Sequence, residues 1–75
     1  MSTLNQVTAG DAIRVATRLG FVFRRQKGSH AVYKRESDKR RVVILMHGSR
    51  TYPIGTARRM LRDMDITPED FERLK

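Results

Sequence analysis

A single histidine in a strongly basic stretch is the feature of this sequence best suited to chemistry. His30 directly follows the turn formers Gly28 and Ser29. Its imidazole, with an unperturbed pKa of about 6.5 for the residue type, can accept and donate a proton near neutral pH. Five cations surround it in the sequence: Arg24, Arg25, Lys27, Lys34 and Arg35. Because cations attract a polyanion and offset its charge, we predict a phosphate-handling site centred on His30.

Other roles must be weighed for each of these residues. An isolated histidine is more often structural, with its imidazole bonded to the backbone near a turn, but the cation cluster favours catalysis at His30. For His47, which follows an apolar run and precedes Gly48, we expect a turn-stabilising or loop-packing role. The hydroxyl of Ser29 and the amides of residues 28–30 suit either phosphate contact or a plain turn.

A β-hairpin is the element expected to position His30. Strand-like residues 21–23 and 31–33 flank a turn at residues 26–29, so His30 opens the second strand, residues 30–34. Alternation places Ala31 and Tyr33 on one face of that strand, and His30, Val32 and Lys34 on the other. The apolar start of the first strand, at residues 21–23, leads us to expect it at the centre of the sheet.

The remaining elements are expected to form the scaffold of this hairpin. A capping-box-like pair, Thr8 and Asp11, begins a first helix that Gly20 can end in the left-handed conformation. After a charged loop at residues 35–40, the apolar run 42–46 predicts a third strand. A second helix opens at Gly55 and Thr56. Four apolar residues at helical spacing give it a core stripe: Ala57, Met60, Leu61 and Met64.

The C-terminal segment has an explicit helix start. Thr67 caps it, Pro68 occupies the first helical position, Asp70 completes the capping box, and Ile66 can contact Phe71. The order is therefore α-β-β-β-α with a short C-terminal helix. We predict one α+β domain over residues 1–75, with helices on one face of a three-stranded antiparallel sheet and residues 1–6 disordered.

Composition narrows the possible partners. A chain of 75 residues with no cysteine has no disulfide or thiolate metal site, and its two histidines and scattered carboxylates predict no metal and no cofactor. No apolar run reaches the length of a signal peptide or membrane span, so we expect a cytoplasmic protein without membrane contact.

The net charge of +8 is unevenly distributed. Residues 24–62 hold twelve Lys or Arg against two acids, whereas residues 63–75 hold five acids against two cations. The basic part predicts a face for an anionic partner, and the acidic tail a helix cap or a contact for another protein. A generally basic surface that only aids solubility is the alternative.

Several motifs in register resemble those of one protein family. They are Leu19-Gly20-Phe21, Arg25-Gln26-Lys27-Gly28-Ser29-His30, His47-Gly48, Ile54-Gly55-Thr56 and Ile66-Thr67-Pro68-Glu69-Asp70-Phe71. Over residues 7–75 the chain resembles the HicA family, the small mRNA-cleaving toxins of HicAB toxin and antitoxin pairs. One departure is Leu45, where the family usually has proline. Leucine restores a backbone N–H, so we expect the strand to run one residue further and His47 to sit differently.

The resemblance implies a fold similar to double-stranded RNA-binding domains, a ribonuclease that needs a histidine at the position of His30, and silencing by a HicB-type antitoxin. RNA carries its own nucleophile in the 2′-OH, so one histidine can cleave it as general base or acid without a metal. The residues expected to contact RNA are Arg24, Arg25, Lys27, Gly28, Ser29 and Lys34.

Two other functions compete with an endoribonuclease toxin acting on mRNA. The same fold and charge would suit a non-catalytic module that binds double-stranded RNA by shape. A DNA-binding regulator could use Arg58, Arg59 and Arg62 of the second helix, but no helix-turn-helix spacing supports it. Tyr33 and Tyr52 could stack on bases, although Tyr33 shares the side of Ala31 and is expected in the core.

Overall fold

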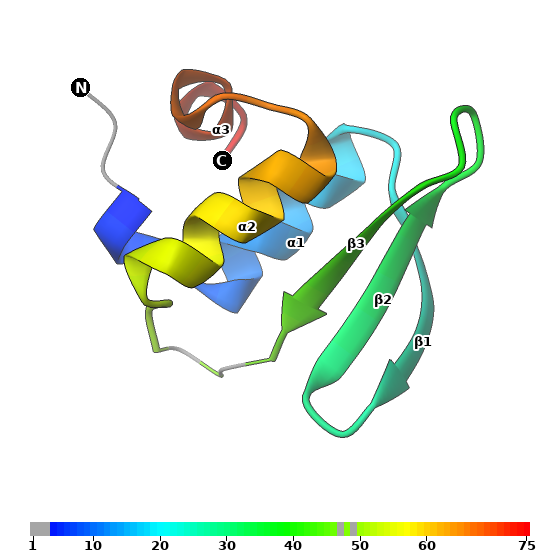
Figure 1. Ribbon diagram of the computed structural model, residues 1–75, viewed down its shortest axis with the longest axis horizontal. Helices are drawn as coiled ribbons and strands as arrows, with labels where there is room; N and C mark the ends of the chain where they lie inside the picture. Colours follow the sequence, from blue (N-terminus) through cyan, green and yellow to red (C-terminus); the bar gives the residue numbers. More distant parts are fainter. Residues whose placement is uncertain (1–3, 47, 49) are drawn as a thin grey trace.

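Three antiparallel strands in the order β1-β2-β3 form the sheet that carries the hairpin (Figure 1). The computed structural model describes residues 4–46, 48 and 50–75. The strands are β1 (Val22–Lys27), β2 (His30–Arg35) and β3 (Arg40–Leu45). A short 3-10 helix, η1 (Leu4–Gln6), precedes α1 (Ala9–Arg18), and α2 (Ile54–Met64) and α3 (Pro68–Leu74) follow the sheet. The predicted α+β order is confirmed.

The helices lie together on one side of the sheet and pack mainly against β3 (Figure 1). Val42 and Ile44 of β3 are fully buried against them. The four residues of the predicted α2 stripe are also buried, as are Val15 of α1 and Phe71 of α3. The β1–β2 hairpin extends beyond the helices, so both faces of β1 are open to solvent.

Local capping sets the helix ends where the sequence places them. Thr8 and Asp11 form a complete capping box at α1, with reciprocal bonds of 3.2 Å, and Thr67 and Asp70 form a second one at α3. Gly20 adopts φ +93° after α1, a left-handed value that glycine takes without strain. The chain therefore turns sharply from α1 into β1.

The expectation that the first strand lies at the sheet centre is wrong, because β1 is an edge strand and β2 is central. A short hairpin turn joins each strand to the next, so consecutive strands lie side by side. The second strand in sequence is therefore also the central strand of the sheet. Phe21 is buried just before β1, whereas Val22 and Phe23 are 61% and 50% exposed.

The N-terminal residues contribute to the core. Of residues 1–6, which we expected to be disordered, residues 4–6 form η1, and Leu4 is buried against the helices. Residues 1–3 lie outside the described part of the chain.

Tyr52 is a core residue, which overturns the expectation that it could stack on bases. It is only 2% exposed, its hydroxyl donates to the Leu45 carbonyl, and its backbone N–H donates to the Val7 carbonyl at 2.8 Å. Tyr52 therefore ties the segment before α2 to the end of β3 and to the N-terminus.

Tyr52→Phe is expected to lower the free energy of unfolding by about 1 kcal/mol, because it removes one partly buried hydrogen bond. Burial raises the pKa of Tyr52 to about 12, above its usual value near 10. Below pH 10 the neutral phenol is present in both states; as pH rises from 10 to 12 the unfolded state ionises first and stability falls. Urea unfolding of the wild type and Tyr52→Phe should show that their difference in free energy of unfolding is smaller at pH 11 than at pH 8. An equal difference at both pH values would contradict this role.

Candidate functional site

The hairpin tip holds His30 at the first position of β2. The two-residue turn between β1 and β2 has Gly28 at φ +59°, a conformation that favours glycine at the first turn position. The side-chain amide of Gln26 donates to the Gly28 carbonyl at 2.9 Å, and the Met46 N–H donates to the Ser29 carbonyl at 2.7 Å. The turn is therefore stabilised by one hydrogen bond within the hairpin and by one to the residue that follows β3.

Sheet register decides which side chains accompany His30. It pairs with Lys27 on β1 and with Leu45 on β3, so these three lie in one row across the sheet. The His30 side chain is exposed, whereas Ala31 on the opposite face is buried. The predicted division of β2 faces is confirmed, and Tyr33 packs on the core side, edge-on to Phe23 at 5.6 Å between ring centroids.

A cationic surface occupies the open face of the sheet. Arg25 pairs with Val32, two residues along β2 from His30, or about 7 Å along the strand. Four cations from all three strands surround Val32 and line a hollow of about 180 Å³: Arg24, Arg25, Lys34 and Arg41. We call these four residues the cationic surface. It brings together three of the predicted RNA-contact residues.

Arg41 was missed at the sequence level. It lies directly opposite Lys34 in the β2–β3 register. A signal for it exists in the alternation of β3, in which Arg41 and Val43 are exposed and Val42 and Ile44 are buried. That alternation predicts the face of the sheet on which Arg41 lies. It does not predict which residue of β2 lies opposite Arg41, because that depends on the length of the turn between β2 and β3.

Glu36 is the acidic neighbour of the cationic surface. Its carboxylate lies 3.5 Å from Arg24 and 3.9 Å from Lys34, and it also pairs with Lys39 at 2.8 Å. Exposed ion pairs of this kind contribute little, about 0–1 kcal/mol. These weak contacts with Glu36 therefore leave Arg24 and Lys34 able to bind a phosphate.

Arg35, expected among the cations near His30, instead serves the scaffold. Its guanidinium donates to the Leu19 carbonyl at 3.0 Å, pairs with Asp38 at 2.8 Å, and lies 4.6 Å from the centroid of the Phe21 ring. Its hydrogen bond lowers the pKa of Asp38 to about 2, so that carboxylate stays ionised. Alternation along β2 puts Arg35 on the same face as Ala31, away from His30.

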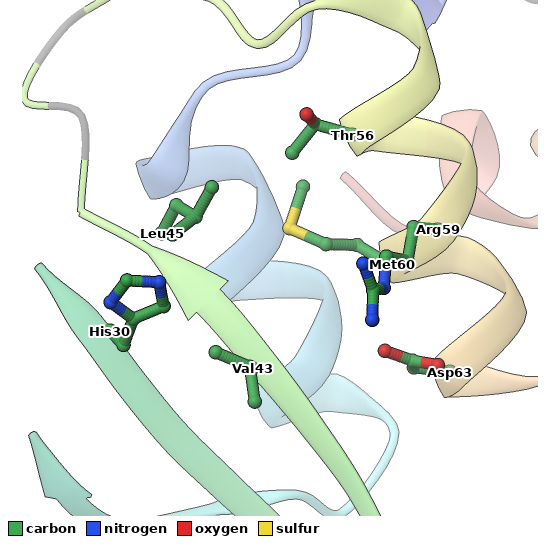
Figure 2. A pocket seen from close by; sticks show the side chains of 7 residues that line it. All are labelled: His30, Val43, Leu45, Thr56, Arg59, Met60 and Asp63. Carbon is green, nitrogen blue, oxygen red and sulfur yellow. The ribbon is translucent and has the colours of Figure 1, made fainter.

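A pocket of about 300 Å³ joins His30 to α2 (Figure 2). From the sheet it is lined by His30, Val43 and Leu45, and from α2 by Thr56, Arg59, Met60 and Asp63. We call this the His30 pocket. None of these α2 residues was predicted to belong to the site around His30, and Arg59 was considered only for DNA binding. Nothing in the local sequence relates a helix face to a hairpin some 30 positions earlier. In Figure 2 the Arg59 and Asp63 side chains both extend from α2 toward the space between that helix and β3.

Comparison with known families identifies the chain. The model of the HicA toxin of bacterial toxin-antitoxin systems matches residues 9–66. The protein belongs to the HicA toxin family. It is therefore the toxin of a toxin-antitoxin system and has an antitoxin as its partner. No curated protein sequence matches the chain.

The family match spans the whole candidate site of this HicA-family toxin. It runs from the start of α1 to just past α2, and so includes the hairpin, the cationic surface and the His30 pocket, while α3 lies beyond it. β3 extends through Leu45, whose backbone N–H a proline would lack. The expected role of His47 falls outside the described residues.

Two further properties of the HicA-family domain concern the described residues alone. Within them, no group of three or more His, Asp or Glu side chains gathers in a way that could hold a metal ion. No helix there is long and apolar enough to cross a membrane.

Proposed function

We propose that this HicA-family toxin is an endoribonuclease that cleaves mRNA without a metal ion, with His30 as its proton-transfer group. The observation that carries the proposal is the position of His30, exposed at a fastened hairpin tip and in one row with Lys27. Beside this row lies the cationic surface, whose charges suit the phosphates of an RNA strand.

The chemistry uses the nucleophile that RNA itself provides. The 2′-oxygen attacks the adjacent phosphorus as it loses its proton, the bond from phosphorus to the 5′-oxygen breaks, and that oxygen takes up a proton. The products are a 2′,3′-cyclic phosphate and a 5′-hydroxyl. His30 removes the first proton or supplies the second, and the Lys27 ammonium offsets the negative charge that develops on the non-bridging phosphate oxygens. One such group contributes about 10²–10⁴-fold, which makes this a slow nuclease.

Purified protein incubated with an end-labelled RNA oligonucleotide in excess chelator tests this proposal. We expect cleavage to proceed, with cyclic-phosphate and 5′-hydroxyl ends on the fragments. Cleavage that appears only after Mg²⁺ is added, or fragments with 5′-phosphate ends, would contradict the mechanism.

A non-catalytic RNA-binding module remains the second candidate, because the cationic surface and the α-β-β-β-α order would also suit duplex RNA bound through its backbone. Binding of duplex RNA without cleavage of any single-stranded RNA would favour that function. Cleavage of single-stranded RNA with weak duplex binding favours the nuclease.

The antitoxin, which we propose is of the HicB type, is expected to act by covering this face. Residues 24–62 carry twelve cations and two acids, a net charge of +10 that an acidic surface would neutralise while speeding association. Amide hydrogen exchange of the free and bound toxin should show protection at residues 25–30. If the antitoxin abolished activity but protected only amides in α1 and α3, it would not act by covering this face, and inhibition from a distance would be the better explanation.

A further inference from the structure

We propose that the His30 pocket binds one unpaired guanine base of the RNA, and that Arg59 and Asp63 read its edge. This inference rests on the proposed RNA-cleaving function and assigns a base-specific subsite to it. It concerns a part of the molecule distinct from the cationic surface, which lies further along the same sheet.

The size and lining of the His30 pocket suit a flat heteroaromatic group. Its volume of about 300 Å³ falls at the small end of the range for ligand sites, and small ligands bind in mostly apolar pockets that hold a few polar groups. Val43 and Leu45 supply one apolar wall and Met60 the other (Figure 2). A thioether such as that of Met60 makes favourable contacts with aromatic rings. Single-stranded RNA is the form of nucleic acid whose bases are free to enter such a pocket.

The polar groups come from one side of α2 and differ in character. Arg59 and Asp63 are four residues apart, so they are neighbours on the helix surface. Arg59 offers only donors, and the Asp63 carboxylate offers only acceptors. The backbone carbonyl of Asp63 accepts a hydrogen bond from the Arg40 guanidinium at 3.3 Å. The side chains of Arg59 and Asp63 form no ion pair within the described residues. Both side chains are therefore available to a ligand.

Guanine is the base whose edges match this pair. It presents two neighbouring donors, N1–H and the N2 amino group, which one carboxylate can accept together. It also presents O6 and N7 as acceptors, the pair that arginine binds in bidentate fashion. Adenine and cytosine each place a ring acceptor beside their amino group, and uracil places carbonyls on both sides of its one N–H. Each of these three would bring an acceptor against the Asp63 carboxylate.

The position of the pocket relates the base to the cleaved bond. His30 itself is part of the lining, so a base held there belongs to a nucleotide next to the reacting phosphate. Arg58 and Arg62, on the same helix, line a separate hollow that also involves Leu4 and α3. They provide matched controls, since they have the same charge and the same helix but do not contact the His30 pocket.

Binding of the four nucleoside 3′-monophosphates, followed by NMR amide shifts, tests the proposal without requiring turnover. All four share one phosphate, so differences among them report the base. We expect guanosine 3′-monophosphate to bind about tenfold more tightly than the other three, as one bidentate base contact allows, and to shift resonances of residues 56–63. Asp63→Asn and Arg59→Gln should each remove that preference, while Arg58→Gln should keep it.

Equal affinity for the four nucleotides, or shifts confined to the cationic surface, would overturn the base pocket. Loss of the preference in Arg58→Gln as well would show a general charge effect and would also overturn it. A toxin that binds guanosine 3′-monophosphate selectively but cleaves no RNA would contradict the proposed function and leave the guanine site standing. A toxin that cleaves RNA without any preference for guanine would contradict the guanine site and leave the proposed function standing.

Discussion

His30→Ala is expected to lower the single-turnover rate of RNA cleavage by about 10²–10⁴-fold, the usual contribution of one general acid or base. RNA affinity should change little, because the phosphate contacts assigned to the cationic surface remain. The side chain is exposed, so its removal should alter stability by no more than about 0.5 kcal/mol. The measurements are cleavage of a labelled oligonucleotide at saturating protein, fluorescence anisotropy for binding, and growth after induction.

Added imidazole provides a sharper readout for His30→Ala. If the lost group transfers a proton, free imidazole should restore part of the cleavage rate, with a pH dependence that follows imidazole ionisation. A folded His30→Ala protein that cleaves RNA and inhibits growth like the wild type would remove His30 from the mechanism.

Neutralising three of the four cations of the cationic surface is expected to produce the second large effect. In a variant with Arg25→Gln, Lys34→Gln and Arg41→Gln, RNA affinity should fall and its dependence on salt should flatten, by about 2 in the slope of log affinity against log salt concentration. This follows from about 0.7 for each single-strand phosphate contact. The cleavage rate at saturating protein should persist, because His30 is unchanged. Affinity measured at four salt concentrations gives the slope.

The matched control carries the same charge change elsewhere. Arg18→Gln, Arg58→Gln and Arg62→Gln together remove three exposed cations that are not part of the cationic surface. The slope for this control should stay close to that of the wild type. An equal flattening in both triple variants would mean that overall charge, and not this face, attracts RNA.

The sequence alone determined the features that depend on residues within a few positions of one another. Thr8 with Asp11, and Thr67 with Asp70, begin helices because a side chain three residues away satisfies the backbone. Gly20 and Gly28 mark turns because their positive φ values suit glycine. The apolar stripe of α2 follows from the helical period. His30 at the start of β2 belongs to this group, since the two-residue turn before it is local.

Only the tertiary structure decided which of these elements share a surface. The β2–β3 register placed Arg41 opposite Lys34, and the packing of α2 beside β3 brought Arg59 and Asp63 to His30. The tertiary structure also places Arg35 and Tyr52 outside the candidate site. Arg35 donates a hydrogen bond to the Leu19 carbonyl, and Tyr52 is buried in the core. These positions depend on how the whole chain buries its apolar surface, because contacts between distant residues form only once strand register and helix packing are set.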